Sequence, residues 1–275
     1  MARRARVDTE LVRRGLARSR EHATELVSAG RVLINGTVAT KPATAVQAGT
    51  PVRVTERSDE QQWASRGAHK LLGALATFEP RGLLVQGRRC LDAGASTGGF
   101  TDVLLQRGAR EVVAVDVGYG QLVWRLQSDE RVHVLDRTNA RSLDAEAVGG
   151  AVELVVGDLS FISLRLVLPA LAACAAPGAD LVPMVKPQFE VGRERVGTGG
   201  VVRDPELRAA AVLDVAATAG GLGLRTRGAV ASPLPGPSGN VEFFLWLTHD
   251  PAAAAAQDLD EVRSMISTAV REGPQ

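Results

Sequence analysis

The sequence is poor in cysteine, histidine and long apolar runs, and each shortage excludes a class of protein. Two cysteines in 275 residues, Cys90 and Cys174, stand far apart in apolar surroundings, which excludes a disulfide framework and fits a reducing cytoplasm. The four histidines lack paired ligand spacing, so we expect no metal site. The most apolar long segment, residues 164–179, is broken by an arginine and two prolines, and the first residues lack an apolar stretch. We therefore expect a cytoplasmic protein with no secretory signal and no stable membrane insertion.

Charge is nearly balanced over the whole chain but unevenly distributed along it. The formal net charge is +1, yet residues 1–57 hold 11 lysines and arginines against 5 acidic residues, net +6. The remaining residues hold 21 against 26, net −5. A basic segment on a mildly acidic body favours a polyanionic partner, most naturally a nucleic acid.

Residues 90–100, with the sequence CLDAGASTGGF, combine an apolar strand, a glycine-rich turn and the start of a helix. Glycines let the backbone turn tightly and approach a ligand, and a helix that begins near Gly99 directs free N–H groups toward it. The pattern indicates a nucleoside-cofactor site. A strand–turn–helix corner that binds nothing is the alternative.

The residues of this motif favour S-adenosylmethionine over a dinucleotide. A dinucleotide fingerprint requires G-x-G-x-x-G, but Ser96 occupies the position of the middle glycine. Asp92 would repel phosphates and suits a cationic amino-acid group instead. Asp116 follows the next apolar run, 18 residues past Gly98, where Rossmann-type sites hold ribose hydroxyls with an acidic residue.

The first sixty residues predict a compact unit of two short helices and a hairpin. Asp8 and Ser19 are candidate helix N-caps. Asn35-Gly36 lies between two short apolar runs and is a strong hairpin signal. The unit is rich in basic residues that could follow phosphates, which supply affinity rather than sequence choice. The candidate RNA-binding residues are Arg3, Arg4, Arg6, Arg14, Arg18, Arg20 and Lys41.

The same segment resembles the S4 RNA-binding domain of ribosomal proteins and rRNA-modifying enzymes. The resemblance lies in the patterns R-V-D at 6–8, L-V-x-R-G-L-A-x-S-R at 11–20 and G-x-V-x-I-N-G at 30–36. It implies a small α+β domain that binds RNA.

From Trp63 onward helical and strand patterns alternate, which predicts a doubly wound, Rossmann-like α/β domain with a mostly parallel, seven-stranded sheet. A last helix is expected over residues 255–271. The other expected elements are a helix at 68–78, parallel strands at 89–92, 111–116, 132–135, 153–157 and 181–185, and an antiparallel pair at 225–230 and 241–247. The predicted division of the chain is an S4-like domain over 1–60, a linker over 61–64 and the α/β domain over 65–275.

Four charged residues stand where this sheet would bring them together. Lys70 lies in the helix before the first strand. Asp158 and Lys186 end parallel strands, and Glu242 opens the last strand. Ligand sites of open α/β sheets lie beyond the carboxyl ends of the strands.

This set of charges fits methyl transfer to a hydroxyl group. The acceptor hydroxyl must lose its proton, and a neutral lysine can take it. We predict Lys186 as this base, because burial and the nearby Lys70 favour its neutral form. Asp158 would orient the two lysines and Glu242 would support them.

Further patterns resemble the TlyA (hemolysin A) family, which joins an S4 domain to an FtsJ-like ribose 2'-O-methyltransferase domain, and the four charged residues are similar to the catalytic tetrad of FtsJ-like enzymes. The patterns are SRGAHK at 65–70, DAGASTGGFT at 92–101, DVGYGQL at 116–122, DLSFIS at 158–163 and VKPQFE at 185–190. The resemblance implies S-adenosylmethionine-dependent methylation of cytidine 2'-hydroxyls in 16S or 23S rRNA, or both, within ribosomal subunits. It implies catalytic roles for Lys70, Asp158, Lys186 and Glu242, and a cofactor site at Asp92, Gly94, Ala95, Ser96, Gly98, Gly99, Asp116, Asp158 and Phe161.

One departure from the family pattern concerns the linker, where Gln61 stands in place of the basic residue expected two positions before Trp63. The coupling of RNA binding to the cofactor site through such a cation is therefore open.

Phe161 and Phe189 each follow a charged site residue by three positions and could form a wall of the cofactor site or stack on a base. We expect a monomer, and the modified nucleotide is not fixed by the sequence.

Three other functions stay open. A methyltransferase of a small molecule is disfavoured by the basic N-terminal unit. An RNA-binding ribosome-assembly factor with little methyltransferase activity is disfavoured by the presence of all four charged residues. A membrane-active hemolysin is suggested by the name of the family, but an alanine-rich amphipathic C-terminal helix is weak evidence for membrane insertion.

Overall fold

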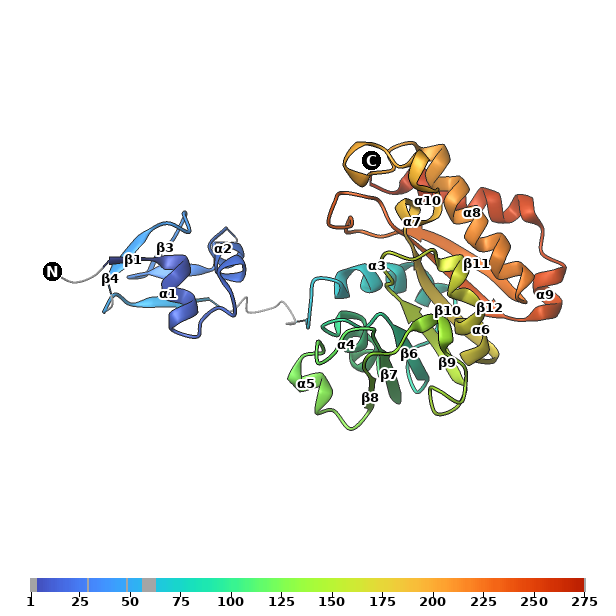
Figure 1. Ribbon diagram of the computed structural model, residues 1–275, viewed down its shortest axis with the longest axis horizontal. Coiled ribbons are helices and arrows are strands. Elements are labelled where there is room, and N and C mark those ends of the chain that lie inside the picture. The colour runs from blue at the N-terminus through green and yellow to red at the C-terminus, as the bar shows by residue number, and fades with distance from the viewer. Residues whose placement is uncertain (1–3, 29, 48, 56–62, 275) are drawn as a thin grey trace. The chain divides into compact units, whose positions relative to one another are not determined.

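The computed structural model describes residues 4–28, 30–47, 49–55 and 63–274. The chain splits into two compact units, which divide between Gln62 and Trp63. Each unit has its own sheets and its own apolar core and is described by itself (Figure 1). The prediction for Gln61 lies outside the described residues.

The smaller unit holds two helices and two small antiparallel sheets around one core. The β1–β4 pair forms one sheet, and the other has the strand order β3-β2-β5. Its core is formed by apolar side chains such as Leu11, Leu26 and Val32. The elements are β1 (Arg4–Arg6), α1 (Val7–Arg13), α2 (Arg20–Ser28), β2 (Val32–Ile34), β3 (Thr37–Val38), β4 (Ala45–Gln47) and β5 (Val52–Val54).

Local sequence signals explain most of this unit. The Ser19 hydroxyl accepts a hydrogen bond from the His22 N–H at 3.2 Å, as expected of an N-cap. Asn35 and Gly36 both adopt positive φ, at 50° and 82°, between β2 and β3, so the predicted hairpin is confirmed. The prediction for Asp8 is wrong, because Asp8 lies inside α1 and its carboxylate pairs with Arg6 at 2.7 Å.

The larger unit contains a seven-stranded sheet with the strand order β11-β12-β10-β9-β6-β7-β8. Neighbouring strands from β10 to β8 are parallel, and β12 is antiparallel to both β10 and β11, so the predicted fold class is confirmed. The strands are β6 (Arg89–Ala93), β7 (Glu111–Val115), β8 (Val132–Leu135), β9 (Val152–Gly157), β10 (Ala175–Val185), β11 (Leu224–Ala231) and β12 (Phe243–His249).

Helices cover both faces of this sheet, which gives three layers. One apolar core lies under α3 and α4 and includes Leu71 and Leu104, and the other lies under α6, α8 and α10 and includes Leu171 and Ile266. Helices α8 and α10 contact each other on the second face (Figure 1). The helices are α3 (Ala68–Phe78), α4 (Gly99–Gln106), α5 (Trp124–Gln127), α6 (Leu168–Cys174), α7 (Pro187–Glu190), α8 (Pro205–Gly221), α9 (Pro251–Ala255) and α10 (Leu259–Glu272), with short 3-10 turns at 79–81, 140–142, 164–166, 193–195 and 198–200.

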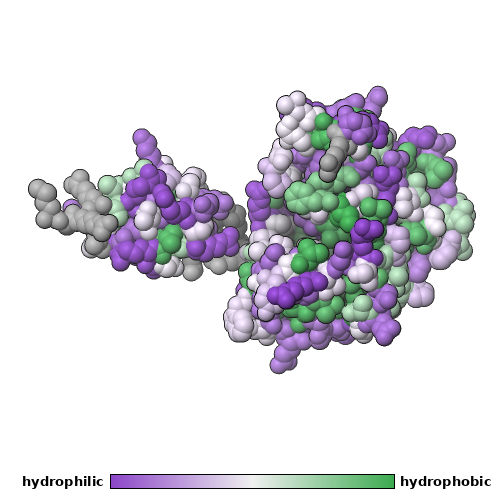
Figure 2. Space-filling model, viewed as in Figure 1, coloured by the Kyte–Doolittle hydropathy of each residue, from purple (hydrophilic) through white to green (hydrophobic). Residues whose placement is uncertain are grey.

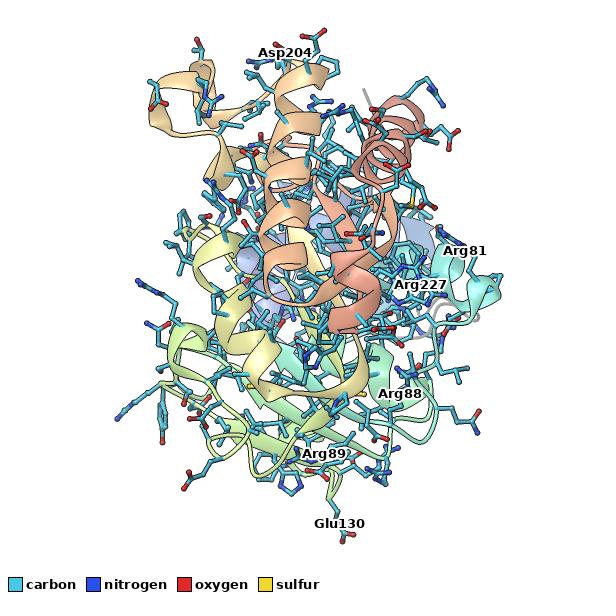
Figure 3. The ribbon with its side chains drawn as sticks, turned by 90° about the vertical axis from the view of Figure 1, so that its right-hand side faces the viewer. Arg81, Arg88, Arg89, Glu130, Asp204 and Arg227 are labelled. Carbon is cyan, nitrogen blue, oxygen red and sulfur yellow. The ribbon has the colours of Figure 1, made fainter. Side chains whose placement is uncertain are left out.

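The edge strand β11 is bent by a bulge and covered by arginine side chains. Its register against β12 shifts between Thr226 and Gly228. The guanidinium carbons of Arg81 and Arg227 lie 5.7 and 5.1 Å from the ring centroid of Trp246, and Figure 3 shows the two arginines near each other. A bulge and cations on an edge strand oppose pairing with another chain.

Three predicted elements differ from the structure by more than one residue. Strand β12 begins at Phe243, two residues after the predicted 241, so Glu242 precedes the strand that it was expected to open. The last helix is not continuous over 255–271 but is replaced by α9 and α10, because the Gln257 side chain between them bonds the N–H and C=O of Thr226 in β11 at 2.9 and 2.6 Å. Asp258 then caps α10 by accepting from the Asp260 N–H. Strand β10 begins six residues earlier than the predicted 181, with an irregular register between Ala175 and Asp180.

Candidate active site

The four charged residues singled out in the sequence meet at the carboxyl ends of the parallel strands. The Lys70 Nζ donates to Glu242 Oε2 at 2.6 Å and lies 3.6 Å from Asp158 Oδ2. The Lys186 Nζ lies 2.6 Å from Asp158 Oδ1 and 4.0 Å from Glu242 Oε1. Two ammonium groups and two carboxylates therefore alternate in a ring of four charges, which is called the charge ring below.

The charge ring is largely withdrawn from water. Lys70, Lys186 and Glu242 are 6%, 7% and 1% exposed, whereas the Asp158 side chain is 24% exposed. Buried charges are costly unless they are paired, and here each ammonium faces two carboxylates. The ring thus holds Lys186 beside Asp158, the partly exposed carboxylate of the four.

Glu242 is brought into the ring by the loop between β11 and β12. The Ser232 N–H donates to the Glu242 C=O at 2.7 Å, which closes the base of this loop. A Cβ on Gly236 would lie 2.7 Å from Glu242 Oε1, so glycine leaves room for the carboxylate. Pro233 lies against α3 at Gly73, where a Cβ would meet the proline ring at 2.6 Å. The loop and the helix that carries Lys70 are therefore packed together.

The glycine-rich turn between β6 and α4 adopts the conformation that its residues predicted. Gly94 and Gly98 have φ of 86° and 99°, and α4 begins at Gly99. Ser96 also has a positive φ, 48°, which is uncommon for a residue with a side chain. Strain of this kind concentrates at functional sites, which supports a binding role for the turn.

Asp116 fixes the second turn of the site. Its Oδ2 accepts from the Ser96 N–H at 2.8 Å and its Oδ1 from the Gly118 N–H at 2.7 Å. Each carboxylate oxygen can accept a further hydrogen bond, so Asp116 retains capacity for a ribose hydroxyl.

A cavity of about 530 Å³ lies between these turns and the charge ring. Such a volume is within the ordinary range for small-molecule sites. Of the predicted cofactor residues, five line the cavity, namely Gly94, Ser96, Asp116, Asp158 and Phe161. The other four, which are Asp92, Ala95, Gly98 and Gly99, are buried and do not line it.

The two buried glycines serve close packing instead. A Cβ on Gly98 would collide with the Leu126 side chain and lie 2.8 Å from that of Leu122. A Cβ on Gly99 would collide with the Ser65 hydroxyl. Their contribution to the site is to bring α3 and α5 close to the turn.

Asp92 is fully buried behind the cavity, and one of its two carboxylate oxygens accepts a hydrogen bond. Its Oδ2 accepts from the Thr101 hydroxyl at 2.7 Å, and its Oδ1 has no hydrogen-bond partner among the described residues. Burial raises the pKa of Asp92 to about 7, opposed by the Thr101 hydrogen bonds and assisted by the negative charges of Asp158 and Asp116. An unpartnered buried carboxylate oxygen is what a cationic ligand group would satisfy.

Sequence reasoning assigned no role to two side chains that organise the site, Ser160 and Glu190. The Lys186 Nζ donates to the Ser160 hydroxyl at 2.7 Å. Glu190 is buried and accepts from the Ser163 hydroxyl and the Leu164 N–H, both at 2.6 Å. Ser160 lies in the DLSFIS pattern at 158–163 and Glu190 ends the VKPQFE pattern at 185–190, so both stood in patterns of the family resemblance, which gave them no role.

Asp102 connects the first residues of the larger unit to α4 and α5. It is buried, accepts from the Ala64 N–H at 2.8 Å, and is ion-paired with Arg125. Burial would raise its pKa, but the hydrogen bonds from Arg125 and Ala64 outweigh burial and hold the pKa below the ordinary value. The neighbouring Trp63 packs against the core under α3 and α4.

Phe161 marks the outer wall of the cavity. It is 91% exposed, has a φ of 64°, and its ring lies 5.4 Å from that of Phe189. A second cavity of about 620 Å³ is lined by Phe161 together with Gln188 and Phe189. Both of the predicted aromatic residues therefore lie at the mouth of the site.

The basic residues of the smaller unit fall into two groups. Arg6 and Arg14 are ion-paired with the buried Asp8 and Glu10 at 2.7 and 2.6 Å, which gives them a structural role. Arg20 is 3.5 Å from Asp8 with its side chain 60% exposed, and Arg18 and Lys41 are exposed. Figure 2 shows a mostly hydrophilic surface on the viewed face of this unit. Arg3 and the side chain of Arg4 lie outside the described residues.

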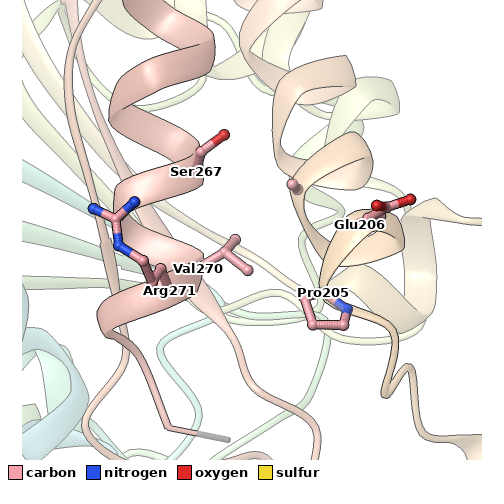
Figure 4. A pocket seen from close by; sticks show the side chains of 6 residues that line it. Pro205, Glu206, Ser267, Val270 and Arg271 are labelled. Carbon is pink, nitrogen blue, oxygen red and sulfur yellow. The ribbon is translucent and has the colours of Figure 1, made fainter.

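Another cavity, of about 630 Å³, lies between α8 and α10 (Figure 4). It is lined by residues such as Pro205, Ser267 and Val270 and is remote in sequence from the strand ends that carry the charge ring. None of its lining residues belongs to the predicted site. Among the described helices, none is long and apolar enough to cross a membrane.

Comparison with known proteins decides the family. Residues 63–249 match the FtsJ-like methyltransferase family, and residues 5–52 match the S4 domain. The chain belongs to the FtsJ-like methyltransferase family. The resemblance to the S4 and FtsJ-like families inferred from the sequence is thereby confirmed.

Relatives of this FtsJ-like chain match it over most or all of its length. The 16S/23S rRNA (cytidine-2'-O)-methyltransferase TlyA of Mycobacterium tuberculosis is 62% identical over 275 residues, covering 100% of both chains. Hemolysin A of Brachyspira hyodysenteriae is 34% identical over 240 residues, 87% of this chain and 98% of its own. A solved structure from Streptococcus thermophilus, which bears a hemolysin name, is 37% identical with a TM-score of 0.71 and covers 99% of this chain and 98% of its own.

Proposed function

We propose that this protein transfers a methyl group from S-adenosylmethionine to the 2'-hydroxyl of a cytidine in rRNA of ribosomal subunits. The observation that carries the proposal is the charge ring, in which a buried lysine lies 2.6 Å from Asp158 at the edge of a cavity beyond the carboxyl ends of the parallel strands. The similarity to the TlyA enzyme over its whole length supports rRNA cytidine as the substrate.

The residues around the cavity fit S-adenosylmethionine. The free oxygen of Asp92 suits the ammonium of the methionine part, and Asp116 suits the ribose hydroxyls. When bound, this cofactor supplies a methyl group on a positively charged sulfur atom.

The charge ring supplies the proton acceptor. Lys186 would take the proton from the ribose hydroxyl as that oxygen forms its bond to carbon. Asp158 fixes the Lys186 amine at 2.6 Å, and Glu242 holds Lys70 at 2.6 Å on the other side of Asp158. The ring therefore limits the movement of the base, and such positioning is a large part of catalysis when the donor is already reactive.

The smaller unit would hold the RNA. Exposed cations such as Arg18, Arg20 and Lys41 can contact phosphates, which provide affinity and a strong salt dependence. The S4 match over residues 5–52 supports this role.

The proposal is tested by incubating the purified protein with radiolabelled S-adenosylmethionine and isolated unmodified 30S or 50S subunits, then mapping 2'-O-methyl groups by mass spectrometry of rRNA digests. We expect methyl incorporation at a cytidine ribose that is absent with Lys186→Ala. Binding of subunits without any methyl incorporation would favour the ribosome-assembly factor. Incorporation into small molecules but not rRNA would overturn the RNA substrate.

A further inference from the structure

We propose that Ser160 is a positioning residue for methyl transfer, which holds the Lys186 amine toward the cavity until the acceptor hydroxyl arrives. This inference rests on the proposed function. It assigns a role to a side chain outside the charge ring, which consists of Lys70, Asp158, Lys186 and Glu242.

The hydrogen bond from Lys186 to Ser160 joins a buried amine to an exposed hydroxyl. The Lys186 Nζ is enclosed by Asp158 at 2.6 Å, Ser160 at 2.7 Å and Glu242 at 4.0 Å. Lys186 is only 7% exposed, whereas Ser160 is exposed and lines the cavity. Of these partners, Ser160 is the uncharged one, and it lines the cavity together with Asp158.

The chemistry of a hydroxyl suits this place. Asp158 and Glu242, when ionised, have no proton to donate, so they can form ion pairs with the Lys186 ammonium but cannot bind the lone pair of its neutral amine. A serine hydroxyl can accept from the ammonium and can donate to the lone pair of the neutral amine. Ser160 therefore keeps a contact with Lys186 in both protonation states, and in the neutral state it directs the lone pair toward the cavity.

The acceptor of the reaction would take the same place. A ribose 2'-hydroxyl is a hydroxyl group like that of Ser160, and it must donate to the same lone pair. When it replaces Ser160, the ribose oxygen forms its bond to the methyl carbon as the O–H bond breaks, and the released proton forms an N–H bond on Lys186. The position of Ser160 Oγ, 2.7 Å from Nζ, thus marks the neighbourhood where the acceptor oxygen meets the base.

The loop that carries Ser160 is held in this arrangement from both sides. On one side, the Asp158 N–H donates to the Ala93 C=O at 3.1 Å. On the other side, Glu190 binds Ser163 and Leu164 at 2.6 Å, which ties the loop to the segment that follows Lys186. Phe161 keeps a φ of 64°, a strained conformation for a residue with a side chain. A strained residue next to Ser160 indicates that the surrounding contacts fix the loop.

The test compares Ser160→Ala with Ser160→Thr in the full-length protein, using single-turnover methyl transfer to subunits at saturating cofactor. Loss of the hydroxyl should lower the rate about 10- to 100-fold, the size expected when a reacting group is misplaced. The threonine variant retains a hydroxyl and should stay within about threefold of wild type. Calorimetry should give a cofactor Kd within about threefold of wild type for both variants, and Ser264→Ala, an exposed serine on α10, is the control for the substitution itself.

A double mutant separates positioning from an independent contribution. If Ser160 acts through Lys186, then Ser160→Ala combined with Lys186→Ala should be no slower than Lys186→Ala alone. Rates that multiply, a threonine variant as slow as the alanine variant, or a wild-type rate in Ser160→Ala would each overturn the role of Ser160. If the wild-type protein itself transfers no methyl group to subunits, the proposed function fails and this inference fails with it.

Discussion

Binding of S-adenosylmethionine should release a proton and weaken as the pH falls below 7, because of Asp92. Burial raises the pKa of this carboxyl to about 7 in the protein without cofactor, so it is largely protonated at pH 6. An ammonium group at its free oxygen requires the ionised form. The sign is therefore fixed: acid favours the protonated, unbound state, and binding expels the proton.

The magnitude follows from the same value. For a site that binds only the ionised carboxyl, the apparent Kd is multiplied by about 2 at pH 7, about 11 at pH 6 and about 100 at pH 5 when the pKa is about 7. Affinity should thus fall about fivefold from pH 7 to pH 6, or roughly 1 kcal/mol, and about tenfold more by pH 5. The amine of the ligand stays charged throughout, because α-amino groups titrate near 7.7 to 8.0.

The assay is isothermal titration calorimetry at pH 7, 6 and 5, in two buffers of different ionisation enthalpy, so that proton release is measured directly. Asp92→Asn is the matched control, because asparagine keeps the shape of the side chain but cannot titrate. It should bind weakly and with little pH dependence over this range. An unchanged wild-type Kd between pH 7 and pH 6, or the same pH dependence in Asp92→Asn, would refute the reasoning.

Three further predictions concern stability and RNA binding. In urea unfolding, Gly98→Ala should lower the free energy of unfolding by about 2 to 4 kcal/mol, because Gly98 has a φ of 99° and a Cβ there would collide with Leu126. Gly82→Ala should lower it by only about 1 to 2 kcal/mol, because Gly82 has a φ of 105° but open space around it. Equal losses in the two variants would contradict this reasoning. Replacing both Arg18 and Lys41 with glutamine should weaken subunit binding and reduce the slope of log K against log salt by about 1 to 2, while the cofactor Kd stays unchanged. On acidification, amide-exchange signals of the smaller unit should show a loss of stability, because hydrogen bonds from Arg6 lower the pKa of Asp8 from 3.8 to about 2. This contribution is complete above about pH 4 and is lost as the pH falls toward 2. Asp8→Asn should abolish that part of the pH dependence.

Most of the sheet could be predicted because its strands are short apolar runs that begin and end at polar residues. The expected helix at 68–78 and strand at 132–135 match α3 and β8 residue for residue, and the strand at 153–157 differs by one residue from β9. The parallel order then placed Asp158 and Lys186 at the same edge. The structure shows that they follow the neighbouring strands β9 and β10, and their charged groups lie 2.6 Å apart.

The features that escaped prediction depend on contacts between distant parts of the chain. The break after α9 depends on Gln257 bonding to Thr226, and alanine-rich sequence alone favours a continuous helix there. The irregular start of β10 contains Pro177 and Gly178, and these residue types argue against a strand in a sequence-based prediction. The contact of Ser160 with Lys186 joins the ends of two strands, and a serine in a loop carries no signal of its partner. Asp8 was assigned as a cap because the first turn of a helix also favours acidic residues.

The residues predicted for the cofactor motif fall into two groups in the structure. Gly94, Ser96, Gly98 and Gly99 were grouped because they are adjacent in sequence, but only Gly94 and Ser96 line the cavity. Glycines in such a turn serve two purposes, approach to a ligand and approach to other helices, and the sequence does not distinguish them. The structure separates the two through the atoms that a Cβ would meet.

The account as a whole depends on Lys186 acting as the base, and the most direct test is the single-turnover rate of methyl transfer to ribosomal subunits for Lys186→Ala and Lys186→Arg at saturating cofactor. Both variants should bind S-adenosylmethionine and subunits within about threefold of wild type and should transfer methyl groups about 10²- to 10⁴-fold more slowly, as expected for loss of a general base. Arginine keeps the positive charge but holds its proton at neutral pH, so it should fail as alanine does. If Lys186→Arg retained most of the wild-type rate, Lys186 would act only as a fixed charge and the proposed base would be wrong.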